Sequence, residues 1–182
     1  MTKQSRNIII LIAACVLVGG LILVMKNIGS TSVNTEVEPM GEVIGDGSAY
    51  LHSDESFTFK LPSDFTFSDL GIVDDEKDIS QVLFSGSPKE RNFQISISPI
   101  EDSVVITIDQ IKNDLPDMVI ENPEEIAIAG ARGVAFETGE KGNPLRTREI
   151  WFTYGSNLYQ ISTVKEFDEE MAEILLSWKW NQ

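Results

Sequence analysis

The sequence predicts an α+β fold: an antiparallel β-sheet with helices on both faces (α-β-α), preceded by one N-terminal transmembrane helix. Three observations lead to this prediction. An uncharged apolar run occupies residues 8–25, and from residue 50 onward strand-like segments are joined by glycine-containing turns. Two further segments in the same region place their apolar residues at the spacing of amphipathic helices.

The composition excludes several classes of function. The 182 residues carry 14 Lys and Arg against 29 Asp and Glu, a net charge of −15, whereas a nucleic-acid partner requires clustered cations that contact phosphates. One Cys and one His leave no disulfide framework and no Cys/His zinc site. The sequence also lacks phosphate-binding loops, dinucleotide-binding glycine patterns and paired-histidine metalloprotease motifs. We therefore expect no nucleic-acid partner, no cofactor and no enzymatic activity.

The apolar run 8–25 predicts a transmembrane helix with Ile8 and Met25 at its ends. It contains no charge, and a helix of this length spans roughly 27 Å, close to the hydrocarbon thickness of a bilayer. Small residues before Cys15 also resemble a lipoprotein processing site, so lipidation of Cys15 stays an open alternative. Apolar residues continue well beyond this Cys, which favours an uncleaved anchor, because cleaved signals turn polar after a short apolar region.

The placement of charge predicts the orientation of this helix. Lys3 and Arg6 precede it, Lys26 alone follows closely, and all 29 acidic residues lie further along the chain. The positive-inside rule therefore places residues 1–7 in the cytoplasm and the C-terminal domain outside, in the periplasm or at the cell surface. No Asn-x-Ser/Thr sequence is present, which favours a bacterial protein. We expect a single-pass protein of the cell membrane, bound to the lipid bilayer through residues 8–25.

A second change in composition marks the start of the folded domain. Residues 26–48 contain no aromatic residue and are rich in Gly, Ser, Thr and Glu, which is typical of a flexible linker. Every Phe, Trp and Tyr lies between Tyr50 and the C-terminus. We therefore expect one extracytoplasmic domain over residues 49–182.

Alternation of apolar and polar residues predicts the strands of this domain. Residues 57–60 alternate and then meet Pro62, which is typical of an outer strand. Further strands are expected over residues 79–85, 93–98, 126–128, 134–136, 148–154 and 158–164. Ile150, Trp151 and Phe152 are large and consecutive, so both faces of their strand need cover. Helices packed on both sides of an antiparallel sheet would supply that cover.

Two segments predict helices. Residues 107–115 begin with Thr107 at the spacing of a capping box. The second helix begins near Asp168, its expected N-cap, and its apolar stripe continues to Trp178. We expect Trp178 in the core, whereas Trp180 falls off the stripe and either pins the C-terminus or contacts a partner.

The order of these elements resembles the PsbP-like fold. The resemblance covers residues 49–182 and is carried by residues 57–62 with Phe65, 108–111, 126–130, 148–152, 158–161 and 178–180. It implies an exported or membrane-associated α-β-α domain with an antiparallel sheet. It also implies a non-enzymatic binding or accessory role in a membrane or envelope protein complex. No ligand-binding residue is carried over from the photosystem members of that family.

Four cations are the candidate partner- or ligand-binding residues: Arg132, Lys141, Arg146 and Arg148. They lie in or beside predicted hairpins of an acidic domain, where positive charge can bind a carboxylate or an acidic partner. The alternative is that they are ordinary outward cations paired with the nearby acids Glu137, Glu140 and Glu149, since surface ion pairs usually need no special role.

Two other features have weaker functional interpretations. His52 is the only histidine, and without a nucleophile motif we expect a surface or edge-strand side chain. The acidic loop 74–78 alternates carboxylates as calcium loops do, but Ile79 and Ser85 replace the turning Gly and the closing Glu. We expect a solvated loop there. The alternative function is an envelope sensor that binds a small molecule or calcium in the exported domain.

Overall fold

The computed structural model describes residues 41–44, 49–52, 56–74, 79–88, 91–100, 104–139 and 146–181. Within these ranges no helix is long and apolar enough to cross a membrane. The predicted transmembrane segment 8–25, the N-terminal residues 1–7 and Cys15 all lie outside the described residues.

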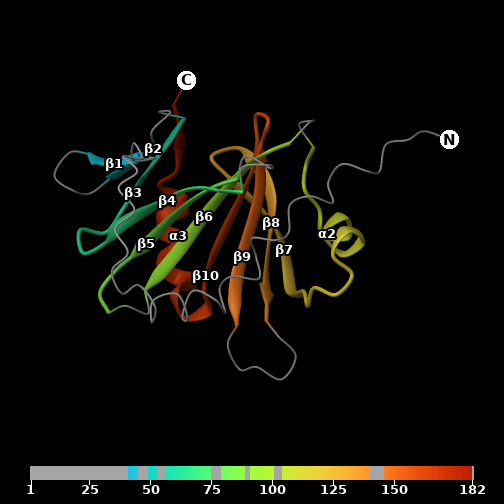
Figure 1. Cartoon of the computed structure of the whole chain (residues 1–182). Helices are drawn as coiled ribbons and strands as arrows, with labels where there is room; N and C mark the ends of the chain where they lie inside the picture. The colour runs from blue at the N-terminus through green and yellow to red at the C-terminus, as the bar shows by residue number, and fades with distance from the viewer. Residues whose placement is uncertain are drawn as a thin grey trace.

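A seven-stranded antiparallel sheet forms the centre of the domain (Figure 1). Its strands, in spatial order, are β4 (Thr66–Asp74), β5 (Ile79–Ser85), β6 (Asn92–Pro99), β10 (Asn157–Val164), β9 (Thr147–Tyr154), β8 (Ala131–Thr138) and β7 (Glu121–Ile128). Neighbours along the chain pair as hairpins, except that β10 returns to lie beside β6. Gly130 and Gly155 have φ of +87° and +59° in two of the turns, a conformation that costs glycine little.

A smaller antiparallel sheet packs against the main one. It contains β1 (Gly41–Ile44), β2 (Ala49–His52), β3 (Phe57–Lys60) and β11 (Lys179–Trp180), in the order β1-β2-β3-β11. A 3₁₀ turn, Lys165–Phe167, leads into helix α3 (Asp168–Leu176), which lies on the same side of the main sheet. The pairing of β11 with β3 joins the C-terminal segment to the start of the domain. Strand β1 lies within residues 26–48, the stretch that the sequence predicts to be a linker.

Aromatic side chains fill the space between these layers. The ring of Phe57 from the small sheet stacks on Trp178, which follows α3, with centroids 4.4 Å apart. Phe84 and Phe93 stack at the same distance on the main sheet. Each of these side chains is at most 4% exposed. Because buried aromatic rings remove a large apolar area from water, this cluster is the principal core of the domain.

The opposite face of the main sheet has a second, smaller apolar cluster. Helix α2 (Ile108–Asp114) buries Ile111 against Phe136 and Trp151, which come from β8 and β9. As expected from its spacing, the Thr107 hydroxyl accepts a hydrogen bond from the backbone N–H of Gln110. Trp151 lies in this cluster whereas Phe152 lies in the principal core, so the prediction that this strand is covered on both faces is confirmed.

The predicted fold class, with helices on both faces of one sheet, is wrong. The described residues form two antiparallel sheets with two short α-helices, of seven and nine residues. The physical reason lies in residues 49–60, whose strands pair with one another and present Tyr50, Phe57 and Phe59 to the main sheet. Sheet-on-sheet packing therefore supplies most of the cover that the sequence assigned to helices.

Candidate functional site

A pocket of about 360 Å³ lies between α3 and the part of the main sheet formed by β7, β8 and β9. The strands contribute Ile126, Ala135 and Ile150, which the register places on the same face of the sheet. The helix contributes Ala172 and Leu175. The small side chains of Ala135 on the sheet and Ala172 on the helix leave a cavity that larger side chains would fill.

Arg148 forms the polar end of this pocket. Its Nη2 donates a hydrogen bond to Glu124 of β7, and its Nε lies 3.3 Å from Oδ1 of Asp168 in the first turn of α3. The Arg148 side chain is only 11% exposed, whereas Glu124 and Asp168 are 54% and 46% exposed. One end of the pocket is therefore a mostly buried arginine side chain flanked by two carboxylates that face water.

The position of Asp168 corrects the predicted start of this helix. Phe167, not Asp168, occupies the N-cap of α3 and makes no capping hydrogen bond through its side chain. Asp168 is instead the first helical residue, and its carboxylate is turned toward Arg148. The Asp168 carboxylate therefore forms an ion pair with Arg148 instead of capping the N-terminus of α3.

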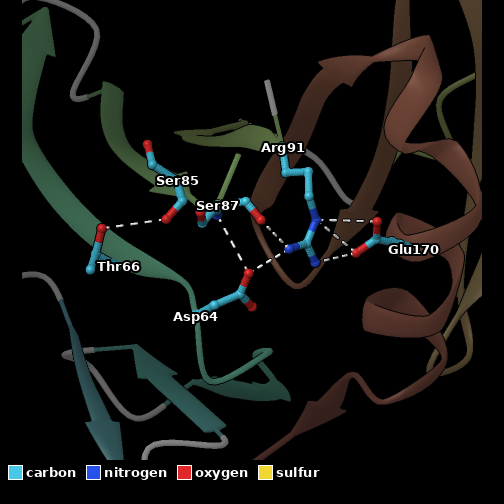
Figure 2. Close-up of polar contacts among 6 residues, drawn as sticks. All are labelled: Asp64, Thr66, Ser85, Ser87, Arg91 and Glu170. Carbon is cyan, nitrogen blue, oxygen red and sulfur yellow. Dashed lines mark hydrogen bonds and ion pairs between the residues drawn. The ribbon is translucent and has the colours of Figure 1, made fainter. Parts of the chain in front are cut away.

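A second arginine holds α3 in place on the sheet (Figure 2). Arg91, just before β6, donates from Nε to both carboxylate oxygens of Glu170 on α3, at 3.2 and 3.1 Å. The same guanidinium donates to Asp64 and to the carbonyl oxygen of Ser87, and it lies 5.1 Å from the ring centroid of Phe65. Figure 2 shows it between the two carboxylates. This cluster fixes the first turn of α3, so one wall of the pocket is held to the sheet.

The Arg91 cluster also lowers the pKa of the Asp64 carboxyl. Burial acts to raise that pKa, but hydrogen bonds from the Ser87 backbone N–H and from Arg91 outweigh it. Asp64 is therefore held as the carboxylate. Sequence reasoning did not single out Arg91, because its partner Glu170 is 79 positions away along the chain.

Of the three candidate cations that the structure describes, only Arg148 lines the pocket. Arg146 forms an ion pair with Glu121 at 3.3 Å, and Arg132 is exposed on β8. Lys141 lies outside the described residues. The structure therefore does not bring the four together into one patch among the residues it describes.

The acids near these cations divide between the two faces of the sheet. Glu137 binds Lys165 at 2.8 Å, and hydrogen bonds from Lys165 and Asn122 lower the pKa of the Glu137 carboxyl. Glu149 points to the α2 side and is 1% exposed. Its carboxylate accepts hydrogen bonds from Thr147 at 3.0 Å, from Trp151 Nε1 at 3.3 Å and from Ser162.

Burial raises the pKa of Glu149 to about 7, against the opposing effect of its three hydrogen-bond donors. The alternative interpretation of the four cations made Glu149 one of their surface partners, which its burial contradicts. Strand alternation offered a signal to the contrary, because residues 149 and 151 share a face and Trp151 is a core residue.

The remaining candidates are structural. His52 is 7% exposed and its ring stacks on Phe57 at 4.8 Å, so the expected surface position is wrong. Trp180 stacks on Tyr154 at 3.8 Å in the strand that closes the small sheet, which confirms that it pins the C-terminus. No group of three or more potential metal-ligating side chains occurs in the described ranges, and loop residues 75–78 lie outside them.

Comparison with known proteins identifies the fold but not a family by sequence. No family model and no curated protein matches the chain. The solution structure of cyanobacterial PsbP from Synechocystis sp. PCC 6803 is similar over 85% of this chain and 99% of that one, with 13% identity and a TM-score of 0.50.

A crystal structure from Bacteroides thetaiotaomicron VPI-5482 is similar over 74% of this chain, with 16% identity and a TM-score of 0.49. The chain spans about half the length of that protein, 48% of it. The resemblance predicted from the order of elements is thus confirmed at the level of structure by the cyanobacterial protein. The chain has a PsbP-like fold.

Proposed function

We propose that the chain is a non-catalytic accessory module that binds a protein of a membrane or envelope complex. Residues 8–25 anchor it in the cell membrane, and its C-terminal domain lies on the outer side of that membrane. The observation that carries this proposal is the pocket beside α3 together with Leu176 at its edge. Leu176 is 88% exposed, more than any other large apolar side chain of the described residues. An apolar hollow beside an exposed apolar side chain and rimmed by charge is typical of an interaction site.

The charge of the chain favours a protein over the lipid surface as the bound partner. The net charge is −15, and all acidic residues follow the predicted membrane segment. An anionic lipid surface would repel such a domain. A PsbP-like fold supports an accessory role, because the resemblance implies binding rather than catalysis.

Site-specific photo-crosslinking in native membranes tests this proposal. A photoreactive amino acid replaces Leu176 in the full-length chain, and the matched control carries it at Lys112, which is exposed on α2. We expect a reproducible adduct with one membrane or envelope protein from position 176 and none from position 112. Equal labelling from both positions, or no adduct from position 176, would contradict the proposal.

A second candidate function is an envelope sensor that binds a small molecule. The pocket volume favours it, since about 360 Å³ falls within the range of small-molecule sites, roughly 300–1,000 Å³. A ligand that binds the folded chain raises its unfolding temperature in proportion to the logarithm of ligand concentration. A thermal-shift screen of the full-length chain against small metabolites therefore separates this candidate from the first.

A further inference from the structure

We propose that the pocket beside α3 binds an aliphatic carboxylate, with the carboxylate on Arg148 and the hydrocarbon between α3 and the strands. This inference rests on the proposed function, because it names the chemistry recognised by the same pocket. The two sources of such a group are the C-terminal residue of a polypeptide and a free aliphatic acid.

The hydrogen bonding of Arg148 is the first argument. A guanidinium offers five N–H donors, yet this one makes a single hydrogen bond to the described residues, from Nη2 to Glu124. Its Nε is buried and makes no hydrogen bond, although Oδ1 of Asp168 lies 3.3 Å away. Buried donors are normally satisfied. An incoming carboxylate would bind Nε and Nη2 side-on, in a bidentate geometry that arginine favours, in place of Asp168 and Glu124.

The two acids beside Arg148 permit this binding and restrict it. Glu124 and Asp168 are each about half exposed, so either carboxylate can turn to water when a ligand arrives. Because water screens the exposed carboxylate of each pair, displacing that carboxylate costs little. Their negative charge remains close to the ligand, however, and repels a dianion more than a monoanion. The site therefore favours a carboxylate over a phosphate.

The shape of the pocket supplies the second argument. Away from Arg148 the lining is aliphatic and aromatic, including Ile128, Leu175 and Trp178. The charged lining residues come from β9 (Arg148), from β7 on the far side of β8 (Glu124) and from the first turn of α3 (Asp168). Leu176 ends the helix and Trp178 follows it, so both lie toward the other end of the pocket. A ligand that matches this arrangement is polar at one end and apolar along the rest.

Calorimetric titration of the full-length chain in lipid nanodiscs tests the inference. N-acetyl-leucine represents a polypeptide C-terminus, octanoate represents a free aliphatic acid, and N-acetyl-leucinamide is the neutral control of the same shape as the first. We expect one or both acids to bind at least about tenfold more tightly than the amide, because a charge-assisted hydrogen bond is lost with the amide. Whichever acid binds more tightly identifies the source.

Two variants distinguish recognition by Arg148 from a structural role. Arg148→Gln removes the guanidinium and should abolish the preference for acid over amide. Glu124→Gln leaves Arg148 in place but removes a competing and repelling carboxylate, so it should tighten acid binding several-fold without changing amide binding. Equal affinity for acid and amide, no binding of either acid, or unchanged acid binding in Glu124→Gln would overturn the inference. Such a failure leaves the crosslinking result at position 176 unaffected, so the two proposals fail separately.

Discussion

Glu149 makes the stability of the domain depend on pH in a direction opposite to that of an ordinary paired glutamate. Burial raises its pKa from the ordinary value of 4.5 to about 7. Between these pH values the folded chain holds the proton and the unfolded chain releases it. The folded state therefore loses stability as the pH rises from about 4.5 to about 7, and the loss is complete above that range.

The size of the effect follows from the two pKa values. A separation from 4.5 to about 7 corresponds to about 3 kcal/mol of unfolding free energy. Glu149→Gln removes the ionisation but keeps a side chain of the same shape, and the hydroxyls of Thr147 and Ser162 can rotate to hydrogen-bond with the amide. We expect the variant to gain less than about 1 kcal/mol over the wild type at pH 5 and up to about 3 kcal/mol at pH 8.

Urea denaturation of the detergent-solubilised full-length chain, followed by tryptophan emission from pH 5 to pH 9, measures this difference. Glu125→Gln is the matched control, because Glu125 is exposed on the edge strand β7. It should leave the pH profile unchanged. A stability difference between Glu149→Gln and wild type that is constant across pH, or that grows toward pH 5, would refute the reasoning.

Three further substitutions test the packing around the site. Gly133→Ala places a Cβ 2.2 Å from the carbonyl oxygen of Trp151, so strands β8 and β9 must separate, and denaturation should show a loss of about 2–4 kcal/mol. Arg91→Met frees the first turn of α3, so hydrogen exchange of the α3 amides should accelerate while that of α2 stays unchanged. In the wild type the lowered pKa of Asp64 stabilises the fold only while Asp64 is ionised, so denaturation should show a loss of stability as the pH falls far enough to protonate it. Thr107→Ala removes the side-chain acceptor at the start of α2 and should cost about 1 kcal/mol in the same denaturation assay; no change would mean that water replaces the cap.

The features that sequence reasoning predicted correctly are local. The hairpin turn at Gly155, the cap at Thr107 and the core position of Trp178 each depend on residues within about a dozen positions of one another. Strand alternation also sufficed to show that Trp151 and Phe152 face different layers.

The features that it missed depend on contacts between distant segments. The pairing of β11 with β3 joins positions more than a hundred residues apart, and nothing in either strand alone indicates its partner. The same holds for Arg91 with Glu170 on α3. Arg148 could be selected from the sequence as a cation on an acidic domain, but its partners Glu124 and Asp168 become neighbours only through strand register and helix packing. The pocket itself requires Ala135 and Ala172 to face each other, which no local pattern encodes.

Hydrogen–deuterium exchange tests the central claim most directly, because it maps a binding surface without assuming where it lies. The full-length chain is compared in native membranes and after purification away from other proteins into nanodiscs. The account predicts slower exchange in the membrane sample at α3 and at the edge strand β7, the two walls of the pocket, with no change at α2. Protection confined to α2 or to the small sheet, or no difference anywhere, would contradict it.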